Sequence, residues 1–382
     1  MATASTIASS PRRNDIDVLR GFAILAVLLL HAGLMTDGIG AHAGLLAVTQ
    51  RLSTGIQLFF VLSGYLVCLS WDRCLANGEG LTGFLVRRAA KIVPLYLLFL
   101  HINIGVFFAG NALAPEVLPF RNSVTASNLD LPNYLIHLVF LQGMVPPLSH
   151  TLLDGSWSVV VEVYFYLLFA LVLARVCRTA PACAWAYAVS LLASMLFTMT
   201  AGSLYSGLSH YGFPAQLPCF ILGVLACRLL QTPDFASRFA PWASATVACA
   251  TLLMLGLVKG ESKPLGDFHV YALCFAALLL ASGTVARLIM PPFAAAFAAM
   301  GRQSYALFFV HLVLLKSSYT VLAALHIALP FWQELALNVL IAVPLSWLLS
   351  HLVFDRIDRF FVALAARWLN RHHRHPTDWS PA

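Results

Sequence analysis

The stretch VLRGFAILAVLLLHAGLM, residues 18–35, decides the fold class of this chain. A helix of that length extends about 27 Å at 1.5 Å per residue, close to the ~30 Å hydrocarbon core of a bilayer. Only Arg20 and His31 interrupt the apolar run. A cleaved signal peptide has a similar apolar core, but these two residues break it and further apolar stretches follow. We therefore expect a retained membrane helix.

Stretches of the same kind recur along nearly the whole chain. Its 382 residues are 60% hydrophobic and only 10% charged, whereas soluble domains carry roughly 25% charged residues. We therefore predict an all-α, polytopic membrane protein of about ten transmembrane helices. The apolar segment 134–144 is too short to cross a bilayer, so we interpret it as interfacial or re-entrant. The predicted spans are residues 18–35, 55–70, 92–109, 157–174, 181–201, 213–230, 241–258, 268–285, 304–325 and 335–354.

The basic residues predict the orientation, because cytoplasmic loops carry the excess of Lys and Arg. Ten crossings place the Lys and Arg clusters that border the spans on one side of the membrane, together with both termini. We therefore predict cytoplasmic N- and C-termini. The chain divides into a polar N-terminal tail (residues 1–14), a transmembrane domain (15–355) and a basic cytoplasmic tail (356–382).

Charge and cysteine content exclude two other classes of function. The net charge of +7 does not indicate nucleic-acid binding, because the Lys and Arg residues lie in short clusters at the ends of apolar segments. The eight Cys form no CxxC pair and mostly lie inside apolar stretches, so we expect neither a metal site nor a disulfide.

Arg20 and His31 are the first candidates for chemistry. They are eleven positions apart, which returns nearly to the same helix face about 16 Å further along. Arg20 lies at the inner end of its span and can extend toward phosphates, whereas His31 lies beyond the midplane. The structural alternatives are a topology anchor for Arg20 and an interhelical hydrogen bond for His31. Because an ionisable residue within a span is by default a hypothesis of a functional site, we favour a functional role for His31.

A cluster of three cations begins the third predicted span. Arg87, Arg88 and Lys91 fall within one helical turn, and Arg88 and Lys91 share a face. Such a cluster at a cytoplasmic membrane edge binds a diphosphate or only anchors the helix.

Two further ionisable residues lie inside predicted spans. Glu162 is the only acidic residue of its span and lies one turn beyond Ser158. A carboxylate at that depth needs a partner, and His31 and His311 are at comparable depths. The alternatives are a neutral Glu162 bonded to a backbone or hydroxyl group, and a His311 that only packs.

These residues belong to short motifs that resemble, in their order along the chain, those of the acyltransferase 3 family of bacterial membrane O-acyltransferases. The resemblance covers roughly residues 14–355. Arg20 and His31 match that family's first-helix pattern of an Arg, ten residues and a His. The segment FFVLSGYL (59–66), which contains Ser63, is similar to its second-helix motif. Arg88 and Lys91 before a Pro are similar to its RxxR motif, although Lys91 lacks the planar fork of an arginine.

Two later motifs extend the resemblance. Trp157 and Ser158 with Glu162 are similar to the family's tryptophan-serine and glutamate motif, and Tyr305 with His311 to a late motif. Val163 departs from the pattern, since many relatives have a second acidic residue there, so no role is carried to that position.

The resemblance implies an acyl-CoA donor, which we expect to be acetyl-CoA. The implied acceptor is a hydroxyl of a sugar, a surface glycan or a glycosylated small molecule, at the bacterial cytoplasmic membrane. No bound cofactor and no metal are implied; acyl-CoA is the co-substrate and the lipid bilayer the surroundings.

Physical chemistry suggests a role for each candidate residue. Arg20, Arg88 and Lys91 suit the donor diphosphate. His31 suits a general base, with Glu162 orienting it, and a covalent acyl-histidine relay is a variant. The remaining site candidates are Arg87, Ser63, Trp157, Ser158, Tyr305 and His311.

Two rival classes of function are a transporter or flippase for a glycan or small metabolite, and a non-catalytic membrane scaffold. In the transporter, Arg20, His31 and Glu162 would line a substrate or proton path. No internal repeat is visible that would suggest the inverted halves of many transporters, which favours the enzyme.

Overall fold

The computed structural model describes residues 14–113, 123–204, 208–259 and 267–373, and this part of the chain consists of helices joined by turns and loops, with no strand. Most of the N-terminal tail and the last nine residues of the basic tail lie outside the described residues. The helices are α1 (Asn14–Leu34), α2 (Ala43–Arg51), α3 (Gly55–Ala76), α4 (Gly80–Leu113), α5 (Leu131–Leu138), α6 (Ser156–Leu168), α7 (Ala174–Val176), α8 (Ala180–Leu204), α9 (Leu208–Tyr211), α10 (Phe213–Gln231), α11 (Phe235–Phe239), α12 (Ala243–Lys259), α13 (Asp267–Leu280), α14 (Ser282–Leu288), α15 (Pro291–Arg302), α16 (Ser304–Ala324), α17 (Phe331–Leu337), α18 (Val343–Leu349) and α19 (Asp355–His373).

The prediction of an all-α membrane protein with about ten spans is confirmed. Among the described residues, 9 helices are long and apolar enough to cross a membrane, and a bent pair makes up to 10. That pair, Phe268–Leu280 and Ser282–Leu288, turns by 81° at its break. Each predicted span overlaps one of these helices or the bent pair. The orientation of the termini stays a prediction.

Several boundaries differ from the predicted ones. The third spanning helix, α4, begins at Gly80 rather than at residue 92, so its cation cluster lies inside the helix. The segment 134–144 forms the end of the short helix α5 and a 3₁₀ turn at Gln142–Met144. The Asp130 side chain caps the first turn of α5 by accepting a hydrogen bond from the Asn133 N–H (2.8 Å). The predicted tail begins within α19, which continues the last span by way of π-helical turns.

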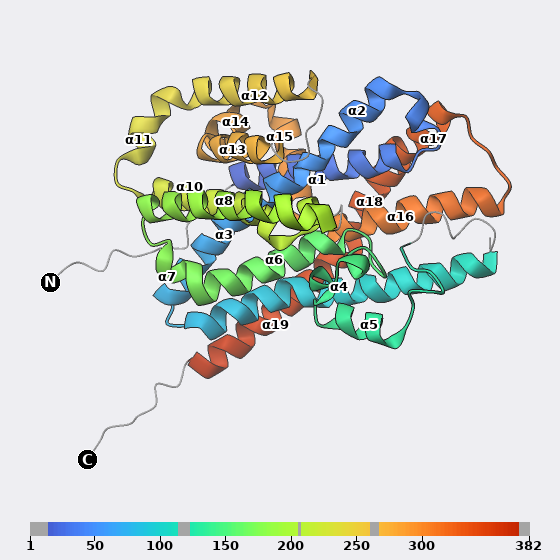
Figure 1. Ribbon diagram of the computed structural model, residues 1–382, viewed down its shortest axis with the longest axis horizontal. Coiled ribbons are helices and arrows are strands. Elements are labelled where there is room, and N and C mark those ends of the chain that lie inside the picture. Colours follow the sequence, from blue (N-terminus) through green and yellow to red (C-terminus); the bar gives the residue numbers. More distant parts are fainter. Residues whose placement is uncertain (1–13, 114–122, 205–207, 260–266, 374–382) are drawn as a thin grey trace, which may run out of the picture.

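Helix α1 lies at the centre of the helix packing, and a glycine of α15 allows the closest contact with it. It packs against α15, α3 and α16, and in Figure 1 it lies between α12–α15 on one side and α4, α6 and α19 on the other. A Cβ on Gly301 of α15 would lie 1.8 Å from the Asp17 carbonyl oxygen, so only glycine permits this crossing. Small residues at such contacts are the usual means of helix association in membranes.

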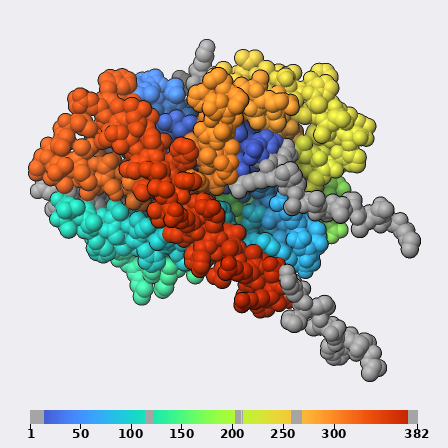
Figure 2. All heavy atoms as spheres, turned by 180° about the vertical axis from the view of Figure 1, so that it is seen from behind, coloured from blue at the N-terminus to red at the C-terminus, as the bar shows by residue number. Residues whose placement is uncertain are grey.

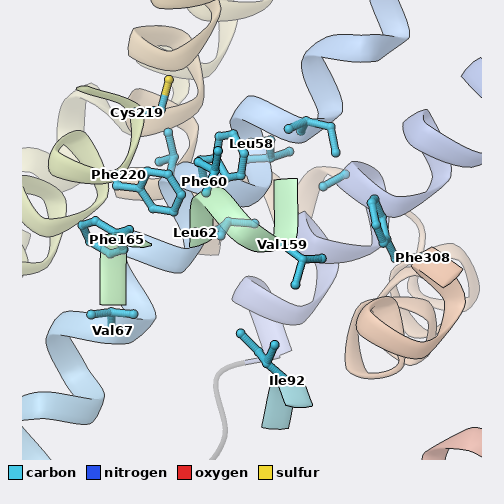
Figure 3. Packing of buried hydrophobic residues seen from close by; sticks show 14 of the residues in the cluster. Leu58, Phe60, Leu62, Val67, Ile92, Val159, Phe165, Cys219, Phe220 and Phe308 are labelled. Carbon is cyan, nitrogen blue, oxygen red and sulfur yellow. The ribbon is translucent and has the colours of Figure 1, made fainter. Parts of the chain in front are cut away.

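A second close contact joins α3 and α10 and continues into an aromatic layer. A Cβ on Gly64 would lie 2.0 Å from the Phe220 carbonyl oxygen. The Phe220 ring stacks between Phe60 of α3 (4.5 Å between centroids) and Phe165 of α6 (4.3 Å), as Figure 3 shows. This layer holds α3 and α6 together beside the polar residues described next.

Candidate active site

A cavity of about 150 Å³ lies between α1, α3, α4, α6 and α16. We call it the Glu162 cavity. It brings together seven of the residues predicted from sequence to belong to one site, drawn from five helices. These are Arg20, Ser63, Arg88, Lys91, Ser158, Glu162 and Tyr305.

The Glu162 carboxylate faces two hydroxyl groups. Its Oε1 accepts a hydrogen bond from the Tyr166 hydroxyl (2.5 Å) on the next turn of α6 and another from Ser63 Oγ of α3. A carboxylate in a membrane span needs such donors, because hydrocarbon offers none. The three side chains therefore form one polar wall of the cavity.

The cations of the cavity approach from α4 and α1. The Arg88 guanidinium donates to the Leu66 carbonyl oxygen (3.2 Å) and lies 5.2 Å from the centroid of the Tyr166 ring, a cation–π distance. Lys91 forms an ion pair with Asp358 of α19. With the Arg20 guanidinium, three cations line the cavity.

Arg20 and Tyr305 connect this cluster to the start of α16. Arg20 Nη2 donates to Ser304 Oγ (2.9 Å), and the Tyr305 hydroxyl donates to the Ile92 carbonyl oxygen of α4 (2.9 Å). These bonds tie α1 and α4 to the start of α16 beside the cavity.

Four predicted candidates do not line the Glu162 cavity, and two of these, Arg87 and Trp157, stabilise the fold around it. Arg87 forms an ion pair with Glu79, donating from Nε at 2.8 Å, and the guanidinium holds the pKa of Glu79 below its usual value. Trp157 packs against Phe60 and the ring of Tyr211, whose centroid is 4.9 Å away. Both side chains stabilise the fold around the cavity rather than line it.

His31 and His311 form a separate polar pair. His311 Nδ1 lies 3.0 Å from the Leu307 carbonyl oxygen, so this nitrogen carries the hydrogen and Nε2 is an acceptor. His31 Nδ1 lies 3.1 Å from that Nε2 and 2.9 Å from the Val27 carbonyl oxygen. The His31 hydrogen is therefore on Nδ1, and the lone pair of its Nε2 is directed away from the pair. His311 is fully buried, whereas His31 is partly exposed.

The expected pairing of Glu162 with His31 is not found: no hydrogen bond or ion pair joins them within the described residues. Depth along the membrane normal, which suggested the pair, does not decide lateral neighbours. His311 takes that place beside His31, and the ring of Phe308, a lining residue of the Glu162 cavity, lies 6.1 Å from that of His311.

A further buried charge was missed by the sequence analysis. Lys316 of α16 is 5% exposed and forms an ion pair with Asp154, which also accepts a hydrogen bond from Ser123 (2.9 Å). The rule that selected His311, an ionisable residue within a span, applies equally to Lys316.

Comparison with known proteins decides the family. Residues 13–351 match the family model described as an acyltransferase domain, that of acyltransferase 3. The chain belongs to the acyltransferase 3 family. It is similar to the acyltransferase MdmB of Streptomyces mycarofaciens, with 26% identity over 330 residues, 80% of this chain and 79% of that protein. No solved structure matches the chain.

Membership in the acyltransferase 3 family confirms the resemblance and identifies the chain as an enzyme that transfers acyl groups. The seven residues of the Glu162 cavity and the histidine pair are therefore the ionisable and hydroxyl groups of an acyltransferase membrane domain.

The folding of this acyltransferase brings together one group of side chains that could bind a metal, from two segments far apart in the sequence. Ligand atoms of Cys68, Asp72 and Cys227 lie within 4.8 Å of one another, although the sequence shows no clustered cysteines. Two hydrogen bonds from the Arg228 guanidinium to Asp72 (2.7 and 3.2 Å) already neutralise the carboxylate. This group is thus an ion pair beside two buried thiols.

Proposed function

We propose that this protein is a membrane O-acyltransferase that moves an acyl group, in the first instance acetyl, from acyl-CoA to a hydroxyl of a carbohydrate-bearing acceptor. The acceptor classes are a sugar, a surface glycan or a glycosylated small molecule, and the location is a bacterial cytoplasmic membrane. The single observation that carries the proposal is the Glu162 cavity, in which cations meet a hydrogen-bonded carboxylate and two hydroxyls.

The cations suit the donor. The diphosphate of acyl-CoA is held by Arg20, Arg88 and Lys91, which line the cavity from two helices. The predicted topology places them on the cytoplasmic side, where acyl-CoA is made. Lys91 exchanges its partner Asp358 for a phosphate oxygen as the donor binds.

The Glu162 carboxylate is placed to position the acyl arm of the donor. Glu162 fixes the directions of the Ser63 and Tyr166 hydroxyls, which face the cavity beyond the cations. It acts as a positioning group for the thioester and not as the partner of His31.

His31 suits the acceptor. An alcohol is a weak nucleophile at neutral pH and needs a base within hydrogen-bond reach. Because Nδ1 of His31 donates to Val27 and His311, its Nε2 lone pair is free to take the proton of the acceptor hydroxyl. The acceptor oxygen then bonds to the thioester carbon, the carbon–sulfur bond breaks, and the CoA thiolate leaves with the proton that His31 returns.

The experiment is acceptor-dependent release of CoA by the purified full-length protein in lipid nanodiscs. The acceptor is found by mass spectrometry of surface glycans and small products from a deletion strain, as a species that has lost one acyl group. His31→Ala is expected to lower kcat by at least about 100-fold, the contribution of a general base, with unchanged insertion in the membrane.

His101→Ala is the matched control. His101 also lies in a spanning helix and its Nδ1 donates to the carbonyl oxygen four residues earlier (2.7 Å), but it is exposed and lies outside the two clusters. Near-normal CoA release by His31→Ala would reject His31 as the base. Movement of acceptor across the bilayer without CoA release would instead indicate a transporter.

A further inference from the structure

A second cavity meets the Glu162 cavity at Arg20 and Lys91, which line both. It measures about 760 Å³ and lies between α15, α18 and α19, so we call it the α15–α19 cavity. Figure 2 shows α19 (red) crossing this face of the molecule. Ligand sites typically measure roughly 300–1,000 Å³, so this space takes a much larger group than the Glu162 cavity does.

The charge of the α15–α19 cavity favours an anion. Its wall carries four cations, Arg20, Lys91, Arg302 and Arg359, against the two carboxylates of Asp355 and Asp358. Both carboxylates are already matched, Asp355 with Arg359 (2.7 Å) and Asp358 with Lys91. The wall therefore keeps an excess of positive charge, and Arg302 adds an exposed guanidinium at its edge.

The same wall contains polar atoms that suit a nitrogen heterocycle. In the described part of this wall, the buried atoms without a hydrogen-bond partner are Gln303 Oε1, Trp347 Nε1 and Asp358 Oδ1. Gln303 Nε2 donates to His351 Nδ1 (2.7 Å), which leaves the hydrogen of that imidazole on Nε2. The Gln303 acceptor and the two N–H donors of Trp347 and His351, together with the indole ring, match the edge and face of a purine. A ligand that reaches them recovers hydrogen bonds that burial leaves unmade.

We propose that the α15–α19 cavity binds the 3′-phosphoadenosine end of the acyl-CoA donor. The inference rests on the proposed function, and it adds the subsite that recognises the nucleotide. Arg302 binds the ribose phosphate, whereas Gln303, Trp347 and His351 contact the base. The diphosphate passes Arg20 and Lys91 at the junction, and the pantetheine arm enters the Glu162 cavity.

The test compares two donors on the full-length protein in nanodiscs, acetyl-CoA and acetyl-pantetheine, which lacks the nucleotide. Arg302→Ala is expected to raise KM for acetyl-CoA about tenfold, the effect of one lost charge-assisted hydrogen bond. Its kcat and its KM for acetyl-pantetheine stay unchanged. Arg356→Ala is the matched control, because this exposed arginine of α19 does not line the cavity. Equal effects of Arg302→Ala on both donors, or none, would overturn the proposal.

Direct binding of adenosine 3′,5′-bisphosphate separates this proposal from the proposed function. Binding that weakens about tenfold in Arg302→Ala supports the subsite even where neither donor yields transfer, an outcome that would reject only the transferase. Transfer with unaltered discrimination between the donors in Arg302→Ala would reject only the subsite. Displacement of the bisphosphate in phosphatidylglycerol but not phosphatidylcholine nanodiscs would assign the cavity to a lipid headgroup and also reject it.

Discussion

Replacing His311 tests how the proposed base is oriented. His311 Nε2 accepts the Nδ1 hydrogen of His31 at 3.1 Å, and the Val27 carbonyl oxygen shares that hydrogen at 2.9 Å. In His311→Leu, His31 Nδ1 still donates its hydrogen to the Val27 carbonyl oxygen. No buried donor is therefore left without an acceptor, and the protein remains folded. The His31 ring, however, loses the contact that fixes its rotation.

The magnitude follows from the energy of one neutral hydrogen bond. Such a bond contributes about 0.5–1.5 kcal/mol, which corresponds to a roughly 2- to 13-fold change in rate. Burial of the pair favours the upper part of this range. We therefore expect His311→Leu to lower kcat about tenfold, well short of the loss in His31→Ala, with an unchanged KM for acetyl-CoA.

The assay is acceptor-dependent CoA release over a series of pH values. His311→Gln is the conservative control, because an amide oxygen placed near the original Nε2 accepts the same hydrogen and should recover most of kcat. A normal kcat in His311→Leu, or a loss confined to KM for the donor, would refute the orientation of His31 by His311.

Two further predictions concern stability. Gly301→Ala is expected to destabilise the protein by about 1–3 kcal/mol, because its Cβ would lie 1.8 Å from the Asp17 carbonyl oxygen and the helices must separate. The midpoint of thermal unfolding in detergent measures this loss of stability. The control is Gly283→Ala, whose Cβ would meet nothing within 4 Å, and equal midpoints of the two variants would contradict the prediction. Since Arg87 lowers the pKa of Glu79, their ion pair stabilises the fold above the ordinary value of 4.5 and less as pH falls through the lower folded value. Below pH 4.5, the free energy of unfolding should fall less with decreasing pH in Glu79→Gln than in the unsubstituted protein. An identical fall would reject the Arg87–Glu79 pair as its source.

The predicted spans agree with the structure because hydropathy is local. Each stretch of ~20 apolar residues partitions into lipid on its own account, so neighbours are not needed to recognise it. The same rule overlooked α15, whose 12 residues are too few to cross a membrane. Its burial depends instead on the close approach of Gly301 to α1, a contact between distant segments.

The candidate residues were predictable one by one, and their partners were not. An ionisable side chain in an apolar helix is visible in sequence, which identified Arg20, His31, Glu162 and His311. The interpretation of Glu162 as the partner of His31 used depth alone, whereas helix rotation and crossing decide which side chains meet. Asp358, which pairs with Lys91 from a helix continuous with the last span, carried no such signal.

The sequence by itself determined that this chain is a membrane protein of many helices, and that ionisable residues occur within its apolar spans. Both properties follow from residue type and position along the chain. Only the tertiary structure decided that the cations of α1 and α4 share one cavity with Glu162, that His31 pairs with His311, and that a second cavity joins at Arg20 and Lys91. These contacts join helices far apart in sequence, and their geometry depends on how closely the glycine-lined helices pack.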